Sequence, residues 1–156
     1  MLYYLLSAVL VVIDQLVKAW VRASIPLGQS IPFLPGIMEL TYIQNTGAAF
    51  SSFSSLTWLL ALISLLASVA VAVLMARKLF TRPLGRLSLA LILGGAVGNL
   101  IDRVFLGFVT DMFATTFMDF AVFNVADICV VTGGILMVIY VLFFYDKQKE
   151  ARHDAP

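Results

Sequence analysis

Residues Gly107 to Cys129 read GFVTDMFATTFMDFAVFNVADIC and place three carboxylates, Asp111, Asp119 and Asp127, between two long apolar runs. The acids therefore stand where the chain leaves a hydrophobic environment and then re-enters it. An ionisable side chain at such a depth is costly, and for that reason it is a candidate functional group. We predict that Asp111 and Asp127 form a pair of carboxylates that activates water at a membrane surface.

The composition of the whole chain indicates a membrane protein. Hydrophobic residues make up 62% of the 156 and charged residues 12%, with a mean hydropathy of +1.01, whereas a soluble domain has about 25% charged residues. A soluble chain of this length could not bury so much apolar surface. The net charge of +1 shows no bias toward nucleic acid, so no nucleic-acid partner is expected. The single cysteine, Cys129, excludes an internal disulfide and a cysteine-ligated metal site.

Four apolar segments are long enough to cross about 30 Å of hydrocarbon as helices. They cover about residues 2–21, 56–76, 87–104 and 125–145. The first lacks a basic region before it and a clean cleavage site after it, so we expect a retained helix and not a removed signal peptide. The predicted fold class is an all-α integral membrane protein, with residues 1–156 forming a single membrane-embedded domain.

The segments between the spans differ in character. Residues 22–55 contain prolines and glycines that break helices, and Met38–Ile43 is rich in the β-branched and aromatic residues that suit a short strand. Residues 105–124 carry Asp111 and Asp119. We expect 22–55 and 105–124 to form a small subdomain of β-sheet and loops that lies on the bilayer surface.

Basic residues set the predicted orientation. The loop 77–86 contains four lysines and arginines and the tail 146–156 contains three, together seven of the ten in the chain. Because cytoplasmic segments collect positive charge, we place this loop and this tail in the cytoplasm. Four spans then put both termini inside and put 22–55 and 105–124 outside. The candidate site therefore lies near the outer face of the cytoplasmic membrane.

Further polar groups lie in or beside the first span. Asp14 and Lys18 are four residues apart and share one face of the first helix. They form either a structural ion pair or a tether for the outer sheet or a substrate backbone.

Asn45 and Gly47 belong to a turn signal, NTGAAF, which forms a tight turn or offers Asn45 and open backbone to an extended peptide.

The third span ends in the sequence GGAVGNLIDR, which finishes at Arg103. Gly94 and Gly98 have the spacing that lets helices pack closely. Packing does not account for Asn99, Asp102 and Arg103 at the end of the same span. An arginine at that place can orient a carboxylate or hold a lipid ester or phosphate.

Each member of the predicted pair also has a simpler interpretation. Asn124 is suited to cap the fourth span, and Asp127, three positions later, completes a capping box. Asp111 can be a solvated loop acid, and Asp119, in a Met-Asp-Phe sequence, is a rival to it. The fifteen residues between Asp111 and Asp127 could extend about 50 Å, so the chain permits the two carboxylates to meet.

Five short motifs follow one another along the chain. They are DxxxK at Asp14–Lys18, NTGAAF at Asn45–Phe50, GGAVGNLIDR at Gly94–Arg103, VxD at Val109–Asp111 and FNVAD at Phe123–Asp127. Together they resemble the bacterial lipoprotein signal peptidase (signal peptidase II) family. Each motif is weak alone, but the ordered set is specific, and the resemblance covers all four spans.

The resemblance implies an aspartic endopeptidase of the bacterial cytoplasmic membrane that removes the signal peptide from diacylglyceryl-modified prolipoproteins, cutting before the lipidated cysteine. Asp111 and Asp127 fall on the catalytic positions of the family. Other residues fall on positions that shape the site or bind substrate: Asp14, Lys18, Asn45, Gly47, Asn99, Asp102, Arg103 and Asn124. The expected partners are prolipoproteins and membrane lipids. We expect no metal, no cofactor and a monomer.

Two details refine this expectation. The sequence Thr110-Asp111-Met112 departs from the commoner Val-Asp-Phe of the family. The aspartate itself is kept, so the difference affects the packing around it more than its chemistry. Small residues are expected to leave an apolar groove for acyl chains and an apolar signal helix, namely Ala48, Ala49, Gly95, Ala96 and Gly98.

Two other functions are compatible with the residues alone. A small transporter could use Asp14, Asp102 and Asp127 as a proton path, and these charges would then lie at mid-bilayer instead of converging on one face. A non-catalytic membrane scaffold would be insensitive to neutralisation of both aspartates. No internal repeat relates the two halves of the chain, which weakens the transporter interpretation.

Overall fold

The computed structural model describes residues 1–47 and 57–153, with side chains described as far as Tyr145. Within that part of the chain the elements follow in the order α1 (Leu2–Ser24), β1 (Ser30–Leu34), β2 (Met38–Asn45), α2 (Thr57–Ala76), α3 (Pro83–Phe105), β3 (Val109–Thr115) and α4 (Val125–His153). The predicted start of the second span at residue 56 and the small residues Ala48 and Ala49 lie outside the described residues, as do the side chains of the C-terminal tail.

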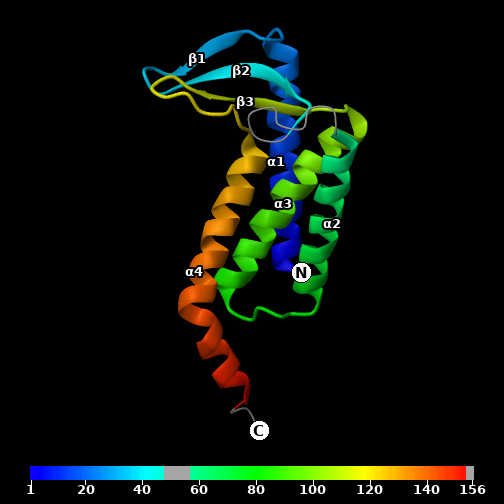
Figure 1. Ribbon diagram of the computed structural model, residues 1–156, viewed down its shortest axis with the longest axis vertical. Coiled ribbons are helices and arrows are strands. Elements are labelled where there is room, and N and C mark those ends of the chain that lie inside the picture. The colour runs from blue at the N-terminus through cyan, green and yellow to red at the C-terminus, as the bar shows by residue number, and fades with distance from the viewer. Residues whose placement is uncertain (48–56, 154–156) are drawn as a thin grey trace.

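The four helices form a bundle with the sheet lying across one end, which we call the sheet end (Figure 1). Each helix contains a window apolar enough to cross a membrane, with a mean hydropathy of 1.7 in α1, 2.7 in α2, 1.6 in α3 and 2.4 in α4. The N-terminus, the connection between α2 and α3, and the end of α4 lie at the opposite end of the bundle. The predicted fold class, four transmembrane helices with a small sheet, is confirmed.

Helix α3 is the centre of the bundle because it packs against each of the other three helices. Half of its apolar window is buried inside the protein, whereas α2 buries 6% and α4 17% of theirs. Soluble monomers do not expose continuous apolar surfaces of this extent. The outward faces of α2 and α4 are therefore surfaces for lipid.

Glycines allow the close contacts of α3 with its neighbours. A Cβ atom added at Gly95 would overlap the carbonyl oxygen of Ala126 on α4, and one added at Gly98 would lie 2.6 Å from Oδ2 of Asp14 on α1. A Cβ atom added at Gly133 of α4 would lie 2.8 Å from the carbonyl oxygen of Ser88 on α3. Gly95 and Gly98 are thus covered by adjacent helices, and the prediction that they leave an open apolar groove is wrong.

The sheet has the strand order β1-β2-β3, and both neighbouring pairs are antiparallel. Its central strand, β2, contains the predicted strand Met38–Ile43 and continues to Asn45. Strand β1 was not predicted because it contains Pro32, which an edge strand tolerates. Buried apolar side chains join the end of α1 to the sheet: Val21, Ile25, Tyr42 and Met112.

Three helices extend beyond the predicted spans. Helix α1 continues to Ser24, three residues past its predicted end. Helix α3 begins at Pro83, inside the segment 77–86 that we predicted to be a loop. Proline suits the first helical turn because its missing N–H would have no intrahelical partner there. Helix α4 runs on to His153, through most of the predicted tail.

The close contact at Gly95 leads to a stability prediction. Gly95→Ala should lower the free energy of unfolding by about 1–3 kcal/mol, because the added methyl group forces α3 and α4 apart. Gly134→Ala is the matched control, since nothing lies within 4 Å of a Cβ atom at that position. Thermal unfolding in detergent micelles measures both, and equal transition temperatures for the two variants would contradict the packing argument.

Candidate active site

Asp111 and Asp127 lie on two elements that meet at the sheet end of the bundle. Asp111 is in β3 and only 3% exposed, and Asp127 is in the first turn of α4. Phe123, just before α4, forms an antiparallel bridge with Phe113 of β3. The nitrogen of Phe113 lies 2.8 Å from the carbonyl oxygen of Phe123, and the nitrogen of Phe123 lies 3.2 Å from the carbonyl oxygen of Phe113. The bridge holds the start of α4 beside β3, and so it brings the two aspartates to one region.

Asp127 is part of a capping box at the start of α4. Its backbone N–H donates to Oδ1 of Asn124 at 2.9 Å, and the N–H of Asn124 donates back to Oδ2 of Asp127 at 3.1 Å. This reciprocal pair satisfies two backbone donors that a helix start would otherwise leave open. The capping interpretation is therefore correct, and it leaves Oδ1 of Asp127 available for other contacts.

Two asparagine amides connect the aspartates to each other. Nδ2 of Asn124 donates to Oδ1 of Asp111 at 2.7 Å and to Oδ1 of Asn99 at 3.1 Å. Nδ2 of Asn99 in turn donates to Oδ1 of Asp127 at 2.8 Å. Asn124 is fully buried, so this route from one carboxylate to the other runs inside the protein.

The opposite oxygen of Asp111 is held from strand β2. Nδ2 of Asn45 donates to Oδ2 of Asp111 at 2.9 Å, while Oδ1 of Asn45 accepts the N–H of Gly47 at 2.9 Å. The second bond is an Asx turn, in which an asparagine side chain binds the backbone two residues later. The turn orients the amide of Asn45 so that its donor faces Asp111. The tight turn predicted from the NTG sequence is therefore present, and contact of Asn45 with an extended peptide stays a prediction.

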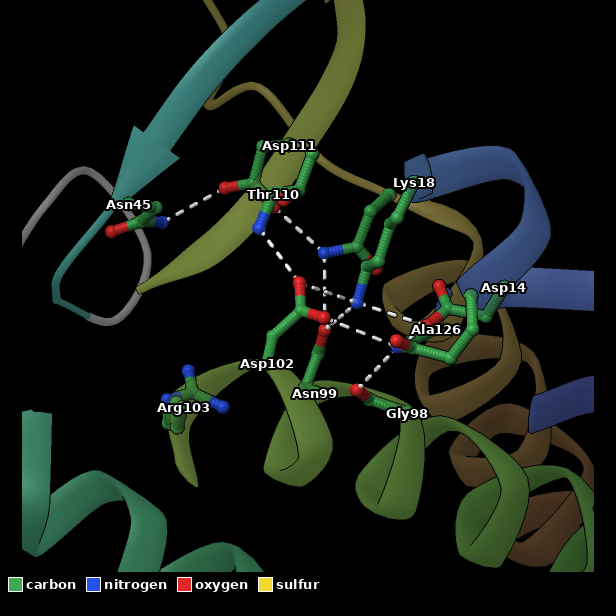
Figure 2. Close-up of polar contacts among 12 residues, drawn as sticks. Asp14, Lys18, Asn45, Gly98, Asn99, Asp102, Arg103, Thr110, Asp111 and Ala126 are labelled. Atoms are coloured by element: carbon green, nitrogen blue, oxygen red, sulfur yellow. Dashed lines mark hydrogen bonds and ion pairs between the residues drawn. The ribbon is translucent and has the colours of Figure 1, made fainter. Parts of the chain in front are cut away.

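Behind the pair lies a buried cluster of charges, seen in Figure 2. Nζ of Lys18 is 2.9 Å from Oδ2 of Asp14 and 3.4 Å from Oδ2 of Asp102, and it donates to Oδ1 of Asn99 at 2.8 Å. All three charged side chains are at most 2% exposed. The ion pair expected from the spacing in α1 is present, but it lies inside the bundle instead of at an exposed boundary.

The cluster also binds the backbone next to each aspartate of the pair. Oδ1 of Asp14 accepts the N–H of Ala126 at 2.9 Å, and Oδ2 of Asp102 accepts the N–H of Thr110 at 2.9 Å. Ala126 immediately precedes Asp127, and Thr110 immediately precedes Asp111. Thr110 and Gln15, which bonds to the same cluster, were not predicted from the sequence.

A cavity of about 580 Å³ opens over the aspartates. Its polar wall comes from Asn45, Asn99, Arg103, Asp111 and Asp127. Its apolar wall comes from β3, the segment before α4 and the side of α4, with Val109, Phe120, Ala121, Val122, Phe123, Ile128 and Val131. A site of this volume, mainly apolar with a few convergent polar groups, suits an organic ligand that places one polar group against the acids.

Arg103 is the cation of the cavity wall. Its charge interacts favourably with the carboxylates of Asp127 and Asp111, and Nη1 lies 3.4 Å from Oγ of Ser64 on α2. Its Nε is buried and has no hydrogen-bond partner in the described part of the chain. Buried donors are normally paired, so an unpaired one beside a cavity is a candidate ligand contact.

Burial raises the pKa of Asp111 from 3.8 to about 6. The hydrogen bonds from the amides of Asn45 and Asn124 oppose this change, and the nearby carboxylate of Asp127 adds to it. A carboxylic acid with a pKa near 6 can hold a proton close to physiological pH, which an ordinary aspartate cannot.

Asp119, the rival acid, lies apart from this arrangement. It is exposed in the segment after β3 and does not line the cavity. Asp14 binds the backbone N–H of Ala126 in the first turn of α4, where Asp127 lies, and Lys18 joins Asp14 to Asp102. The three acids therefore form one group instead of following one another along the bundle, as a proton path would require.

Comparison with known proteins gives a consistent result. A family model described as signal peptidase (SPase) II matches residues 6–143. A lipoprotein signal peptidase of Clostridioides difficile (strain 630) is 43% identical over 150 residues, covering 96% of this chain and 100% of that protein. One of Streptococcus pyogenes serotype M2 is 44% identical over 138 residues, covering 88% of this chain and 91% of that protein.

Solved structures agree with these sequence matches. A bacterial membrane enzyme solved by the in meso method at 2.3 Å resolution aligns with a TM-score of 0.84 and 28% identity, covering 90% of this chain and 87% of that one. A second, at 1.9 Å resolution, aligns with a TM-score of 0.83 and 28% identity, covering 91% and 93%.

The raised pKa of Asp111 leads to a prediction for stability as a function of pH. Because the folded protein holds this proton more tightly than the unfolded chain, the contribution to stability is complete below pH 3.8 and is lost as the pH rises to about 6. Over that window the wild-type protein should lose up to about 3 kcal/mol relative to Asp111→Asn, which has no titrating group there.

Unfolding transitions of the two proteins measured between pH 4 and 8 test this. Asp119→Asn is the control and should follow the wild-type curve. Parallel curves for the wild type and Asp111→Asn would contradict the assigned pKa.

Proposed function

Because the chain belongs to the signal peptidase II family, we propose that it is an aspartic endopeptidase of the bacterial cytoplasmic membrane. Its substrates are diacylglyceryl-modified prolipoproteins, from which it removes the signal peptide by cutting before the lipidated cysteine. The proposal is supported most directly by Asp111 and Asp127, which face a common cavity. The side-chain amides of Asn124 and Asn99 join the two carboxylates.

The reaction needs one ionised and one protonated carboxyl group. The ionised member takes a proton from water, and the oxygen of that water bonds to the carbonyl carbon of the scissile peptide. The protonated member gives its proton to the carbonyl oxygen at the same time. In the second step the carboxyl group that gained the proton of water gives it to the peptide nitrogen, and the C–N bond breaks. A hydroxyl proton of the tetrahedral intermediate passes to the other carboxylate at the same time, so the pair returns to its starting charge.

The raised pKa of Asp111 is consistent with a proton shared by the pair. Burial is the main cause of the raised pKa of Asp111, and the charge of Asp127 adds to it because two nearby carboxylates do not both ionise easily. The amides of Asn45 and Asn124 hold both oxygens of Asp111 in fixed directions. A fixed orientation of this kind lowers the entropic cost of reaching the transition state.

The apolar side of the cavity suits the lipid and the signal helix of the substrate. Ile128 and Val131 of α4 are 45% and 60% exposed, so the cavity wall continues into the surface that faces lipid. A substrate can therefore move in sideways from the bilayer without crossing water. Arg103, with its unpaired Nε, would bind an ester or phosphate oxygen that accompanies the acyl chains.

We place the sheet end at the outer face of the membrane and both termini in the cytoplasm. The four basic residues of 77–86 support this orientation, because they lie at the end of the bundle opposite the sheet. Membrane lipids are then partners along α2 and α4, and the chain acts as a monomer.

Cleavage of a diacylglyceryl-modified prolipoprotein in detergent tests the proposal. Asp111→Asn and Asp127→Asn should each lower kcat by at least about 10³-fold, because each removes one of the two groups that transfer protons. Asp119→Asn should cleave at the wild-type rate, and unfolding curves should establish that all three variants are folded.

Normal cleavage by Asp111→Asn or Asp127→Asn would reject the assignment of the pair. Loss of cleavage in Asp119→Asn alone would identify Asp119 as the catalytic acid. The same substrate without its lipid is the matched control for the proposed specificity, and it should be cut much more slowly.

A further inference from the structure

Each aspartate of the catalytic pair follows a residue whose backbone N–H is bound by a buried carboxylate. Asp14 of α1 binds the N–H of Ala126, and Asp102 of α3 binds the N–H of Thr110, each at 2.9 Å. We call these two contacts the backbone clamps. The direction of each catalytic side chain therefore depends on where the carboxylate of its clamp lies.

The two clamp carboxylates repel each other and need donors between them. Lys18 supplies one charge for two anions and also donates to Asn99. Gln15 supplies the remaining link, since its Nε2 lies 3.2 Å from Oδ2 of Asp14, 3.1 Å from Oδ1 of Asp102 and 3.1 Å from the carbonyl oxygen of Gly98.

Gln15 binds Oδ1 of Asp102, whereas Lys18 approaches the other oxygen of that carboxylate. Both Lys18 and the N–H of Thr110 approach Oδ2 of Asp102, while Oδ1 is approached by Gln15. Asp102 is only 1% exposed, so water cannot easily replace a lost donor at Oδ1. A buried ionised oxygen without a donor is costly, and the carboxylate would rotate or shift to relieve it.

We propose that Gln15 is a positioning residue for catalysis: its amide joins the two backbone clamps and so sets the separation and orientation of Asp111 and Asp127. Gln15 is not one of the residues that line the cavity. It therefore acts through Asp14 and Asp102 and makes no contact with substrate. This inference rests on the proposed peptidase function, because it concerns the geometry of that reaction.

Gln15→Met tests the inference because methionine has a similar length and volume but no donor. We expect kcat to fall about 10- to 100-fold with KM unchanged, since a displacement of the catalytic groups of about 1 Å costs this much without affecting substrate binding. Gln29→Met makes the same chemical change at an exposed residue before β1 and should leave both constants unchanged.

Amide hydrogen exchange provides a second measurement, and it needs no substrate. In Gln15→Met the N–H groups of Thr110 and Ala126 should exchange faster, because both clamps loosen, whereas Gln29→Met should match the wild type. Failure of the wild-type protein to cleave the lipidated substrate would reject the proposed function. Unchanged exchange at Thr110 and Ala126 would reject the role of Gln15 independently of that result.

Gln15→Glu separates positioning from simple filling of space. A protonated carboxyl group restores one donor, while an ionised one adds a third anion to the cluster. The ratio of the kcat of Gln15→Glu to that of the wild type should therefore rise as the pH falls, and the ratio for Gln15→Met should stay constant.

Three kinetic results would also overturn the proposal. One is a kcat per folded molecule that is unchanged in Gln15→Met while the protein is merely less stable. Another is a rise in KM at constant kcat, which would indicate direct contact with substrate. The third is the same pH-independent loss for Gln15→Glu and Gln15→Met.

Discussion

The arrangement of the sheet end depends on one buried ammonium group, that of Lys18, held between the carboxylates of Asp14 and Asp102. An isolated charge in such a place would cost many kcal/mol, and a buried ion pair is retained only where its remaining bonds are satisfied. Here the carboxylates also bind backbone N–H groups from α4 and β3. A single cluster thus connects α1, α3, α4 and the sheet, and its bonds are directional, unlike the apolar packing that surrounds it.

Close approach of the helices makes this cluster possible. Gly98 brings the backbone of α3 so near to α1 that a Cβ atom at this position would lie only 2.6 Å from Oδ2 of Asp14. Gly95 does the same for α3 and the carbonyl oxygen of Ala126 on α4. In a bilayer there is no hydrophobic force that drives helices together, so close packing and internal polar bonds must supply the stability. The glycines therefore contribute to the geometry of the acids as well as to the packing of the bundle.

Local patterns in the sequence predicted the parts of the site that depend on local geometry. The four-residue spacing of Asp14 and Lys18 and the three-residue spacing of Asn124 and Asp127 both predict contacts along one helix, and both contacts are present. The contact of Asp102 with Thr110 could not be predicted in this way, because it depends on how the chain turns between α3 and β3. Gln15 was missed for the same reason, since its partners on α3 are more than eighty residues away.

The sheet illustrates a second limit of local patterns. Strand β2 has β-branched and aromatic residues and was predicted, whereas β3 carries Asp111 among mixed residues and was not. Strand β3 forms because β2 and Phe123 offer backbone partners on both sides of it. The position of Asp111 is therefore a property of the sheet and not of its own neighbours in sequence.

The two interpretations of Asp127, as a helix cap and as one of the paired acids, have a common physical origin. A helix that enters a bilayer must satisfy its first N–H groups at the boundary, where water is still within reach. Asn124 does this with Oδ1, and the same side chain uses Nδ2 to hold Asp111 and Asn99. The start of α4 therefore contributes to the internal geometry of the pair. An acid pair built into a helix cap lies, by construction, at the end of an apolar helix, where the polar wall of the cavity meets its apolar wall.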